Sequence, residues 1–140
     1  MRVLFDTNVV LDVLLDREPY VEAASYLFSQ VEQGELVGSI CATTVTTVYY
    51  LTAKALDVMQ AVNKVQTLLT LFEVATVNRA VLEAALTAGF TDFEDAVIHE
   101  AARHTEAGAI VTRNARDFAK ASIPIYVPDE LMKMLQARRG

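Results

Sequence analysis

The segment VLFDTNVVLDVLLD, residues 3–16, places an aspartate directly after a short apolar run. Residues 2–5 predict a buried strand, and residues 7–15 predict a helix because their apolar side chains recur at helical spacing. Asp6 therefore lies where the first strand ends. In open parallel sheets, ligands bind beyond the carboxyl ends of the strands. The position predicts either a functional-site residue or a simple cap for the helix that follows.

Short strands and helices alternate along the rest of the chain. Further strands are predicted at 36–41, 72–77, 109–112 and 123–127, and further helices at 19–33, 43–56, 58–70, 79–88, 92–106, 115–119 and 128–137. The strands are mostly apolar on both faces, as in a parallel sheet that is covered on both sides. We therefore expect a three-layer α/β/α sandwich with a central, mostly parallel sheet of about five strands. No linker or repeat is evident, so residues 1–140 are expected to form a single domain.

Composition and charge restrict the classes of function. The chain carries a net charge of −6, whereas proteins that bind nucleic acid by bulk attraction to phosphate are usually basic. Two alternatives remain: no contact with nucleic acid, or contact through a local basic patch and metal ions. The single cysteine, Cys41, cannot form an internal disulfide. With no signal peptide and no long apolar stretch, a cytoplasmic protein without a membrane span is expected.

A second strand end contributes polar residues to the same edge of the predicted sheet. The strand at 109–112 is followed by Arg-Asn-Ala-Arg-Asp, so that Asn114 and Asp117 are expected near Asp6. The ordinary alternatives are a helix cap for Asn114 and a first-turn acid for Asp117. The joint placement of these residues at one edge favours a site.

The segment TDFEDA, residues 91–96, adds two more acids. Thr91 and Glu94 form a capping-box pattern, which predicts that a helix begins here. Asp92 and Asp95 are three residues apart and therefore share a face of this helix. They are either surface acids that satisfy the helix dipole or a repelling pair that a divalent cation would stabilise. Oxygen ligands without a histidine or cysteine cluster favour Mg²⁺ or Mn²⁺ over Zn²⁺.

Basic residues stand beside these acids. Arg113, Arg116 and Lys120 are candidate phosphate contacts, with an ordinary solvated face as the alternative. Asp12 lies about one and two-thirds helical turns beyond Asp6 and projects at a different angle. We expect a structural role for Asp12, in an ion pair with Arg17 or with a neighbouring helix.

Four segments resemble a known family in their order and spacing. They are LFDTNVVLD at 4–12, TTVTTVYYL at 43–51, DFEDAVIHEAA at 92–102 and IVTRNARDF at 110–118. Over about residues 2–128 the chain resembles PIN-domain proteins, which are small α/β metal-dependent ribonucleases that include the toxins of VapBC-type toxin–antitoxin pairs. Within the family it is most similar to the subgroup that carries D-F-E-D and T-R-N.

The resemblance implies a set of site residues. Asp6 matches the first metal-binding aspartate and Asp95 the acid on the later helix, with Asp92 as an extra acid. Asn114 stands where many members have an aspartate, and Thr47 where many have a glutamate. The expected catalytic residues are Asp6, Asp92 and Asp95; the expected metal ligands are Asp6, Asp92, Asp95 and Asp117; and the expected substrate-binding residues are Asn114, Thr47, Arg113 and Arg116.

The implied function is hydrolysis of RNA phosphodiester bonds with Mg²⁺ or Mn²⁺, by a toxin that has an antitoxin partner. The neutral residues Thr47 and Asn114 reduce the negative charge of the site and support an alternative. In that alternative the chain is a PIN-fold module that binds RNA or protein, with weakened or lost catalysis. Apolar stripes on residues 20–33 and 43–70 are consistent with a homodimer, although core packing explains them as well.

Overall fold

The computed structural model describes residues 1–139, in which five strands form one parallel sheet. The strands are β1 (Arg2–Phe5), β2 (Val37–Cys41), β3 (Glu73–Ala75), β4 (Ala109–Val111) and β5 (Ile125–Tyr126). Their order is β3-β2-β1-β4-β5, and every neighbouring pair is parallel. The predicted parallel sheet of about five strands is confirmed, with β1 at its centre. Gly140, the last residue of the expected domain, lies outside the described residues.

Seven α-helices and one short 3-10 helix accompany the sheet within residues 1–139. They are α1 (Thr7–Leu14), α2 (Val21–Glu32), α3 (Ala42–Ala55), α4 (Val58–Leu71), α5 (Arg79–Leu86), α6 (Phe93–His104), η1 (Ala115–Phe118) and α7 (Pro128–Arg139). Each corresponds to a predicted helix. α2 begins two residues after the predicted start at Pro19, and Gly34, with φ of +80°, follows its end as the stop signal predicts.

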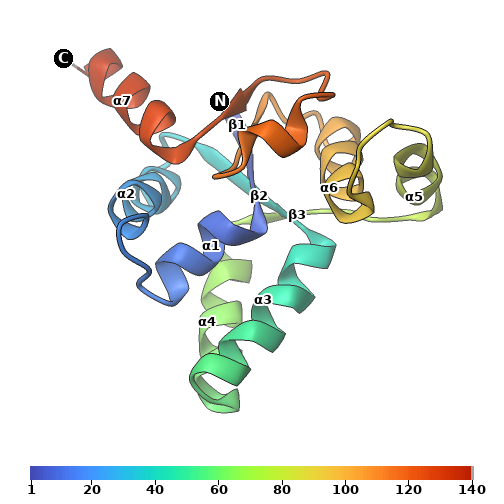
Figure 1. Ribbon diagram of the computed structural model, residues 1–140. Helices are drawn as coiled ribbons and strands as arrows, with labels where there is room; N and C mark the ends of the chain where they lie inside the picture. The colour runs from blue at the N-terminus through green and yellow to red at the C-terminus, as the bar shows by residue number, and fades with distance from the viewer. Residues whose placement is uncertain (140) are drawn as a thin grey trace.

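The sheet has a helical layer on each face, and the alternation of side chains along β1 shows why. Val3 and Phe5 enter one core with residues of α1, α2, α3, α4 and α7. Leu4 points to the opposite face and enters a second core with residues of α5, α6 and η1. Figure 1 shows α2 on one side of the sheet and α5 and α6 on the other. The three-layer prediction is confirmed.

An aromatic cluster and one glycine fix the packing of the first core. The rings of Phe5, Phe28 and Phe72 meet edge to face with centroids 5.0–5.7 Å apart. Gly38 in β2 lies against this cluster, because a Cβ there would be 2.6 Å from Cε1 of Phe72 and 2.9 Å from Cγ2 of Val31. Glycine is therefore required at this position by space.

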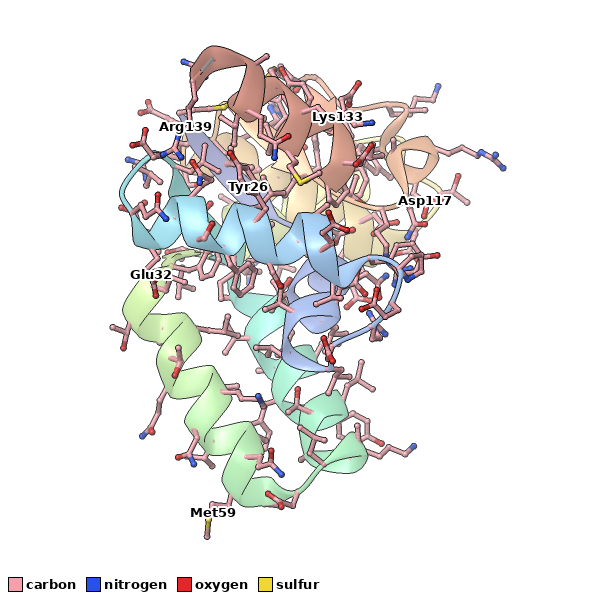
Figure 2. All side chains as sticks on the ribbon, turned by 90° about the vertical axis from the view of Figure 1, so that its left-hand side faces the viewer. Tyr26, Glu32, Met59, Asp117, Lys133 and Arg139 are labelled. Atoms are coloured by element: carbon pink, nitrogen blue, oxygen red, sulfur yellow. The ribbon has the colours of Figure 1, made fainter. Side chains whose placement is uncertain are left out.

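Helices α3 and α4 form a hairpin that extends away from the sheet, with Met59 at its tip (Figures 1 and 2). Several large apolar side chains on this hairpin are exposed: Tyr50, Leu56, Val58, Met59, Val62 and Leu69. The hairpin is thus only partly covered by the rest of the chain. No helix within residues 1–139 combines the length and the apolar character needed to cross a bilayer.

Candidate active site

Asp6 lies at the carboxyl edge of the two central strands. Phe5 and Val111 are partners in the parallel pairing of β1 and β4, and Asp6 and Thr112 follow them directly. The hydroxyl of Thr112 donates to Oδ2 of Asp6 at 2.7 Å, and the backbone N–H of Thr7 donates to Oδ1 at 2.8 Å. Asp6 is also the N-cap of α1. The helix-cap interpretation of its position is therefore confirmed.

Opposing influences act on the carboxyl of Asp6. Burial raises its pKa most strongly, and the negative charge of Asp117 raises it further. The hydrogen bonds from Thr112 and Thr7 and the positive charge of Arg113 act in the other direction, but the pKa stays above its ordinary value. Ionisation of Asp6 therefore costs free energy in this environment, and a nearby cation would reduce that cost.

The acids at the start of α6 lie at the same edge of the sheet. The sequence pattern placed the N-cap of this helix one residue too early. The N-cap of α6 is Asp92 and not Thr91, because Oδ1 of Asp92 accepts a hydrogen bond from the backbone N–H of Asp95 at 3.0 Å. This bond directs one carboxylate of the pair to the helix backbone and leaves the other, Asp95, in the third helical position. The capping-box prediction is wrong in its residues, although it locates the helix.

Asp95 is the acid whose charge is most strongly perturbed. Burial, followed by the negative charges of Asp6, Asp92, Asp117 and Glu94, raises the pKa of its carboxyl to about 7. Burial makes the largest contribution to this raised pKa, and the surrounding carboxylates add to it. Acids from three parts of the chain, after β1, at the start of α6 and in η1, therefore act on one another here.

One cavity of about 280 Å³ contains most of the predicted site residues. Its walls include Asp6, Thr47, Asp95, Asn114 and Asp117. The backbone N–H of Asn114 donates to Oγ1 of Thr112 at 3.0 Å, and the hydroxyl of Thr47 donates to the carbonyl of Thr43 at 3.2 Å. Within residues 1–139 the side chain of Asn114 makes no hydrogen bond, so it does not act as a side-chain cap. Its amide is available to a ligand.

Asp92 lies in an adjoining hollow rather than in this cavity. The adjoining hollow is also lined by Asp95, Arg116 and Asp117, so the two spaces share two acids. The cavity includes further polar residues that the sequence reasoning did not select, among them Asn8 and Glu94. Asn8 lies in the motif at 4–12 and Glu94 in the motif at 92–102, from which only aspartates were predicted as site residues.

Thr112 is a further residue that sequence reasoning did not assign to the site. It is fully buried, and its hydroxyl connects Asp6 with the backbone of Asn114. In the sequence it reads as the last residue of an apolar strand, so periodicity gives no sign of its role. Its position as the first residue of T-R-N, directly after a buried strand, is the available signal.

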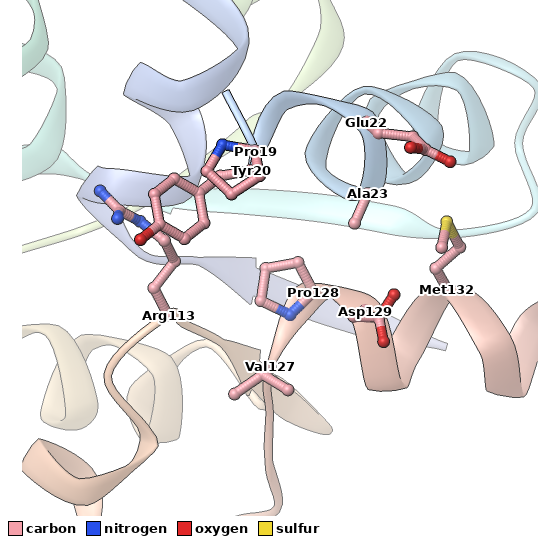
Figure 3. Close-up of a pocket in the computed structure, with 9 residues that line it drawn as sticks. All are labelled: Pro19, Tyr20, Glu22, Ala23, Arg113, Val127, Pro128, Asp129 and Met132. Atoms are coloured by element: carbon pink, nitrogen blue, oxygen red, sulfur yellow. The ribbon is translucent and has the colours of Figure 1, made fainter. Parts of the chain in front are cut away.

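Arg113 does not face the cavity. Its Nε lies 3.0 Å from Oδ2 of the fully buried Asp12, and its guanidinium stacks on the ring of Tyr20 at 3.9 Å (Figure 3). The Arg113 N–H does not point at the oxygen, so this contact is an ion pair rather than a directed hydrogen bond. Asp12 also accepts a 2.9 Å hydrogen bond from Arg17, which confirms the structural role expected for Asp12. The prediction that Arg113 contacts a substrate is not supported by this arrangement.

The donor atoms of the cavity suit a hard cation, but they are not arranged as a finished metal site. Carboxylate and amide oxygens are the ligands that Mg²⁺ and Mn²⁺ prefer. Within residues 1–139, no three Asp, Glu, His or Cys side chains have the mutual spacing of a metal-binding group. The acids nevertheless share one cavity and raise the pKa of Asp95, so they are close enough to repel each other. A cation would relieve this repulsion, provided that the side chains turn toward it.

Comparison with known proteins gives one family match. The family model described as PIN domain matches residues 2–116. A comparison with curated proteins finds no match.

Solved structures with the same fold include components of toxin–antitoxin systems. A toxin–antitoxin complex from Klebsiella pneumoniae contains a chain that is 23% identical, with a TM-score of 0.67 over 90% of this chain and 97% of that one. VapBC-1 from nontypeable Haemophilus influenzae gives 14% identity and a TM-score of 0.69 over 92% and 99%. VapC20 from Mycobacterium tuberculosis, described as a sarcin-ricin loop cleaving toxin, gives 15% and 0.62 over 77% and 86%. At these identities the matches establish a shared fold.

Proposed function

Because this chain belongs to the PIN domain family, we propose that it is a metal-dependent ribonuclease. PIN domains are typically metal-dependent nucleases. The observation that carries the proposal is the carboxyl of Asp95, which lies among other acids in a cavity at the carboxyl edge of the sheet and has its pKa raised to about 7. Such a concentration of like charge destabilises the fold unless a bound cation neutralises it. Strongly perturbed pKa values of this kind cluster at functional sites.

The residues of the cavity have separate roles in this proposal. Asp6, Asp95 and Asp117 hold one or two Mg²⁺ or Mn²⁺ ions, and Asp92 adds negative charge from the adjoining hollow. Thr112 orients Asp6 through its 2.7 Å hydrogen bond. A bound cation would lower the pKa of a coordinated water and stabilise charge on the scissile phosphate.

Two polar residues without charge complete the cavity. Asn114 offers an amide that contacts the substrate, and Thr47 offers a hydroxyl. Where many family members have acids, these residues leave the site less negative, which lowers its affinity for metal and lowers its repulsion of phosphate. We assign the chain to the subgroup with D-F-E-D and T-R-N, because both motifs contribute residues to the cavity wall.

Replacement of Asp6 by Asn tests the catalytic assignment. Wild type is expected to cleave single-stranded RNA when Mn²⁺ is present and not when it is chelated. The rate of Asp6→Asn should fall by at least about 100-fold, because the metal contributes several kcal/mol to the stability of the transition state. Asp129→Asn, at an exposed aspartate that pairs with Lys133, is the matched control and should cleave like wild type. Equal cleavage by Asp6→Asn and wild type would reject the assignment.

The alternative function is a binding module in which catalysis has been lost. Thr47 and Asn114 favour it, because they replace acids that the family usually carries. Measurements of RNA binding and RNA cleavage together distinguish the two functions. A module without catalysis would bind RNA but leave it intact at every Mn²⁺ concentration, and Asp6→Asn would bind it equally well.

We further propose that a small antitoxin protein binds this chain. The support is that structural neighbours of the chain are toxin–antitoxin complexes. If the chain is a toxin, its expression alone should arrest growth, and coexpression of a neighbouring small reading frame should restore growth and yield a complex that copurifies. Arrest that no neighbouring product relieves would contradict the proposed partner.

The exposed face of the α3–α4 hairpin supports a homodimer. The exposed fractions of Tyr50, Val58 and Met59 are 63%, 60% and 74%. Large apolar side chains that gather in this way mark protein interfaces more often than free surface. Sedimentation should show a species of twice the chain mass of 15.4 kDa, which Met59→Glu dissociates. A species of 15.4 kDa alone at high concentration would rule the dimer out.

A further inference from the structure

The adjoining hollow that contains Asp92 continues from the cavity that contains Asp6, which we call the acidic cavity. We call the adjoining hollow the side groove. It has a volume of about 400 Å³, and Asp95 and Asp117 belong to the walls of both spaces. A molecule that reaches the acids from this side would therefore lie in the side groove. The volume is in the range of about 300–1,000 Å³ that is typical of small-molecule sites.

The η1 side of the side groove carries two positive charges beside the acid Asp117. It is formed by η1 and the residues that follow it, including Arg116, Ala119 and Lys120. Arg116 and Lys120 are exposed, and neither takes part in an ion pair within residues 1–139. Arg113, by contrast, is committed to Asp12. Arg116 and Lys120 are thus the cations beside the acidic cavity that can bind phosphate.

One aromatic ring lines the side groove and is packed against buried neighbours. Phe90 lines it and packs against His99, with centroids 4.9 Å apart, and against Phe118 at 5.8 Å. His99 is buried, and its Nε2 accepts a hydrogen bond from the backbone N–H of Ser122 at 3.0 Å. Because Ser122 lies two residues after Lys120, His99 contacts both the aromatic ring and the segment that carries the basic residues.

We propose that the side groove binds the nucleotide next to the scissile phosphate of a single-stranded RNA. The phosphate of this nucleotide contacts Arg116 and Lys120, and its base lies against Phe90. The inference rests on the proposed ribonuclease function, because the acidic cavity then holds the scissile phosphate. A paired base would have to unpair and unstack to enter the groove, which costs energy, so the subsite favours single strands and flexible loops.

The charge contribution is tested by RNA binding. Fluorescence anisotropy of a labelled oligouridine is measured with Ca²⁺ as the divalent ion, and gel electrophoresis confirms that the probe stays intact. The double variant Arg116→Ala/Lys120→Ala should weaken binding about tenfold, as expected for two exposed phosphate contacts. The slope of log K against log salt should fall in magnitude by about 1.4, at roughly 0.7 per contact. The control Arg79→Ala/Arg138→Ala removes the same charge elsewhere and should keep the wild-type slope.

The base contribution is tested by filling the groove. Ala119 is exposed and lines the groove, so Ala119→Leu occupies space without disturbing the core. It should weaken binding of the oligouridine about tenfold, which is within the usual energy of one stacked base. It should leave unchanged the binding of a ribose-phosphate chain of equal length that lacks bases.

The results separate the subsite from the catalytic proposal. If both groove variants bind RNA like their controls, or if Ala119→Leu weakens both probes equally, the subsite is rejected whatever the cleavage assay shows. If the groove variants behave as expected but no form of the protein cleaves RNA with Mn²⁺, the subsite stands and the ribonuclease function fails. Metal-dependent cleavage that is lost in Asp6→Asn, together with the expected binding changes, supports both.

Discussion

At the scale of single residues, Asp95 links the fold to the chemistry. Burial and, after it, the neighbouring acids raise its pKa from the ordinary value of 3.8 to about 7 in the folded chain. Between these values the folded state binds more protons than the unfolded state. The contribution of Asp95 to stability is therefore favourable at low pH and is lost as the pH rises toward and through 7. The site is built at the expense of stability when metal is absent.

Asp95→Asn should remove this pH dependence. In metal-free buffer, wild type should be less stable at pH 8 than at pH 5 by about 1–2 kcal/mol from this group, once solvent screening of the half-exposed carboxyl is allowed for. The variant should show a smaller loss over the same interval. Urea denaturation at the two pH values measures the difference. Parallel losses in wild type and variant would show that Asp95 ionises normally.

Thr112→Val tests whether the buried hydroxyl orients Asp6. Valine keeps the shape of threonine but cannot donate the 2.7 Å hydrogen bond to Oδ2 of Asp6. We expect a loss of stability of about 1.5–3 kcal/mol, since the acceptor is charged and buried, and a fall in Mn²⁺ affinity of about 10–100-fold. Thr112→Ser retains the donor and should restore the Mn²⁺ affinity. If serine fails to do so, the role of Thr112 is packing alone.

The sequence predicts some of the site residues better than others. Asp6 and Asp95 follow a strand end and a helix start, so local patterns locate them. The role of Arg113 depends on Asp12, a residue of α1 far away in sequence, and local patterns give no sign of that contact. His99 and Thr112 owe their roles to buried hydrogen bonds that form only when the loops fold over them. Both lie within the motifs quoted from the sequence, but the motifs give no sign of these hydrogen bonds.

At the scale of elements, hydrophobic periodicity locates each helix and strand, and its errors lie at the ends. Residues 43–56 are rich in Thr, Val and Tyr, which favour strands, yet the helical stripe of Val45 and Val48 prevails in α3. β3 and β5 are shorter than the predicted runs at 72–77 and 123–127. The length of a strand is set by its hydrogen-bonded pairing with a neighbouring strand and not by its apolar character. The start of α6 differs by one cap residue because Thr91 and Asp92 are both good caps.

Gly38→Ala tests the packing between β2 and the first core. The added Cβ would lie 2.6 Å from Phe72 and 2.9 Å from Val31, and both are buried. We expect the free energy of unfolding to fall by about 1–3 kcal/mol, as for other overpacked cores. Gly108→Ala is the control, because its Cβ would come no closer than 3.4 Å to the carbonyl of Arg2. Equal stability of Gly38→Ala and wild type in urea would mean that Phe72 moves aside without cost.

At the scale of the whole molecule, an acidic protein is proposed to bind a polyanion. The net charge of −6 repels RNA at long range, so binding depends on the local cations of the side groove and on divalent ions at the acids. The fold makes this possible by placing the acids after β1 and at the start of α6, and the cations in and after η1, around two connected spaces. Charge patterning, rather than total charge, therefore decides the partner.

Calorimetric titration with Mn²⁺ at pH 6, in two buffers with different ionisation enthalpies, tests the central claim that these acids converge to bind a cation. At this pH the carboxyl of Asp95, with its pKa near 7, is largely protonated. Wild type should bind Mn²⁺ and release a proton to the buffer, Asp6→Asn should lose the binding, and Asp95→Asn should lose both the proton release and most of the affinity. Absence of binding by wild type at millimolar Mn²⁺, or unchanged binding by both variants, would contradict the account.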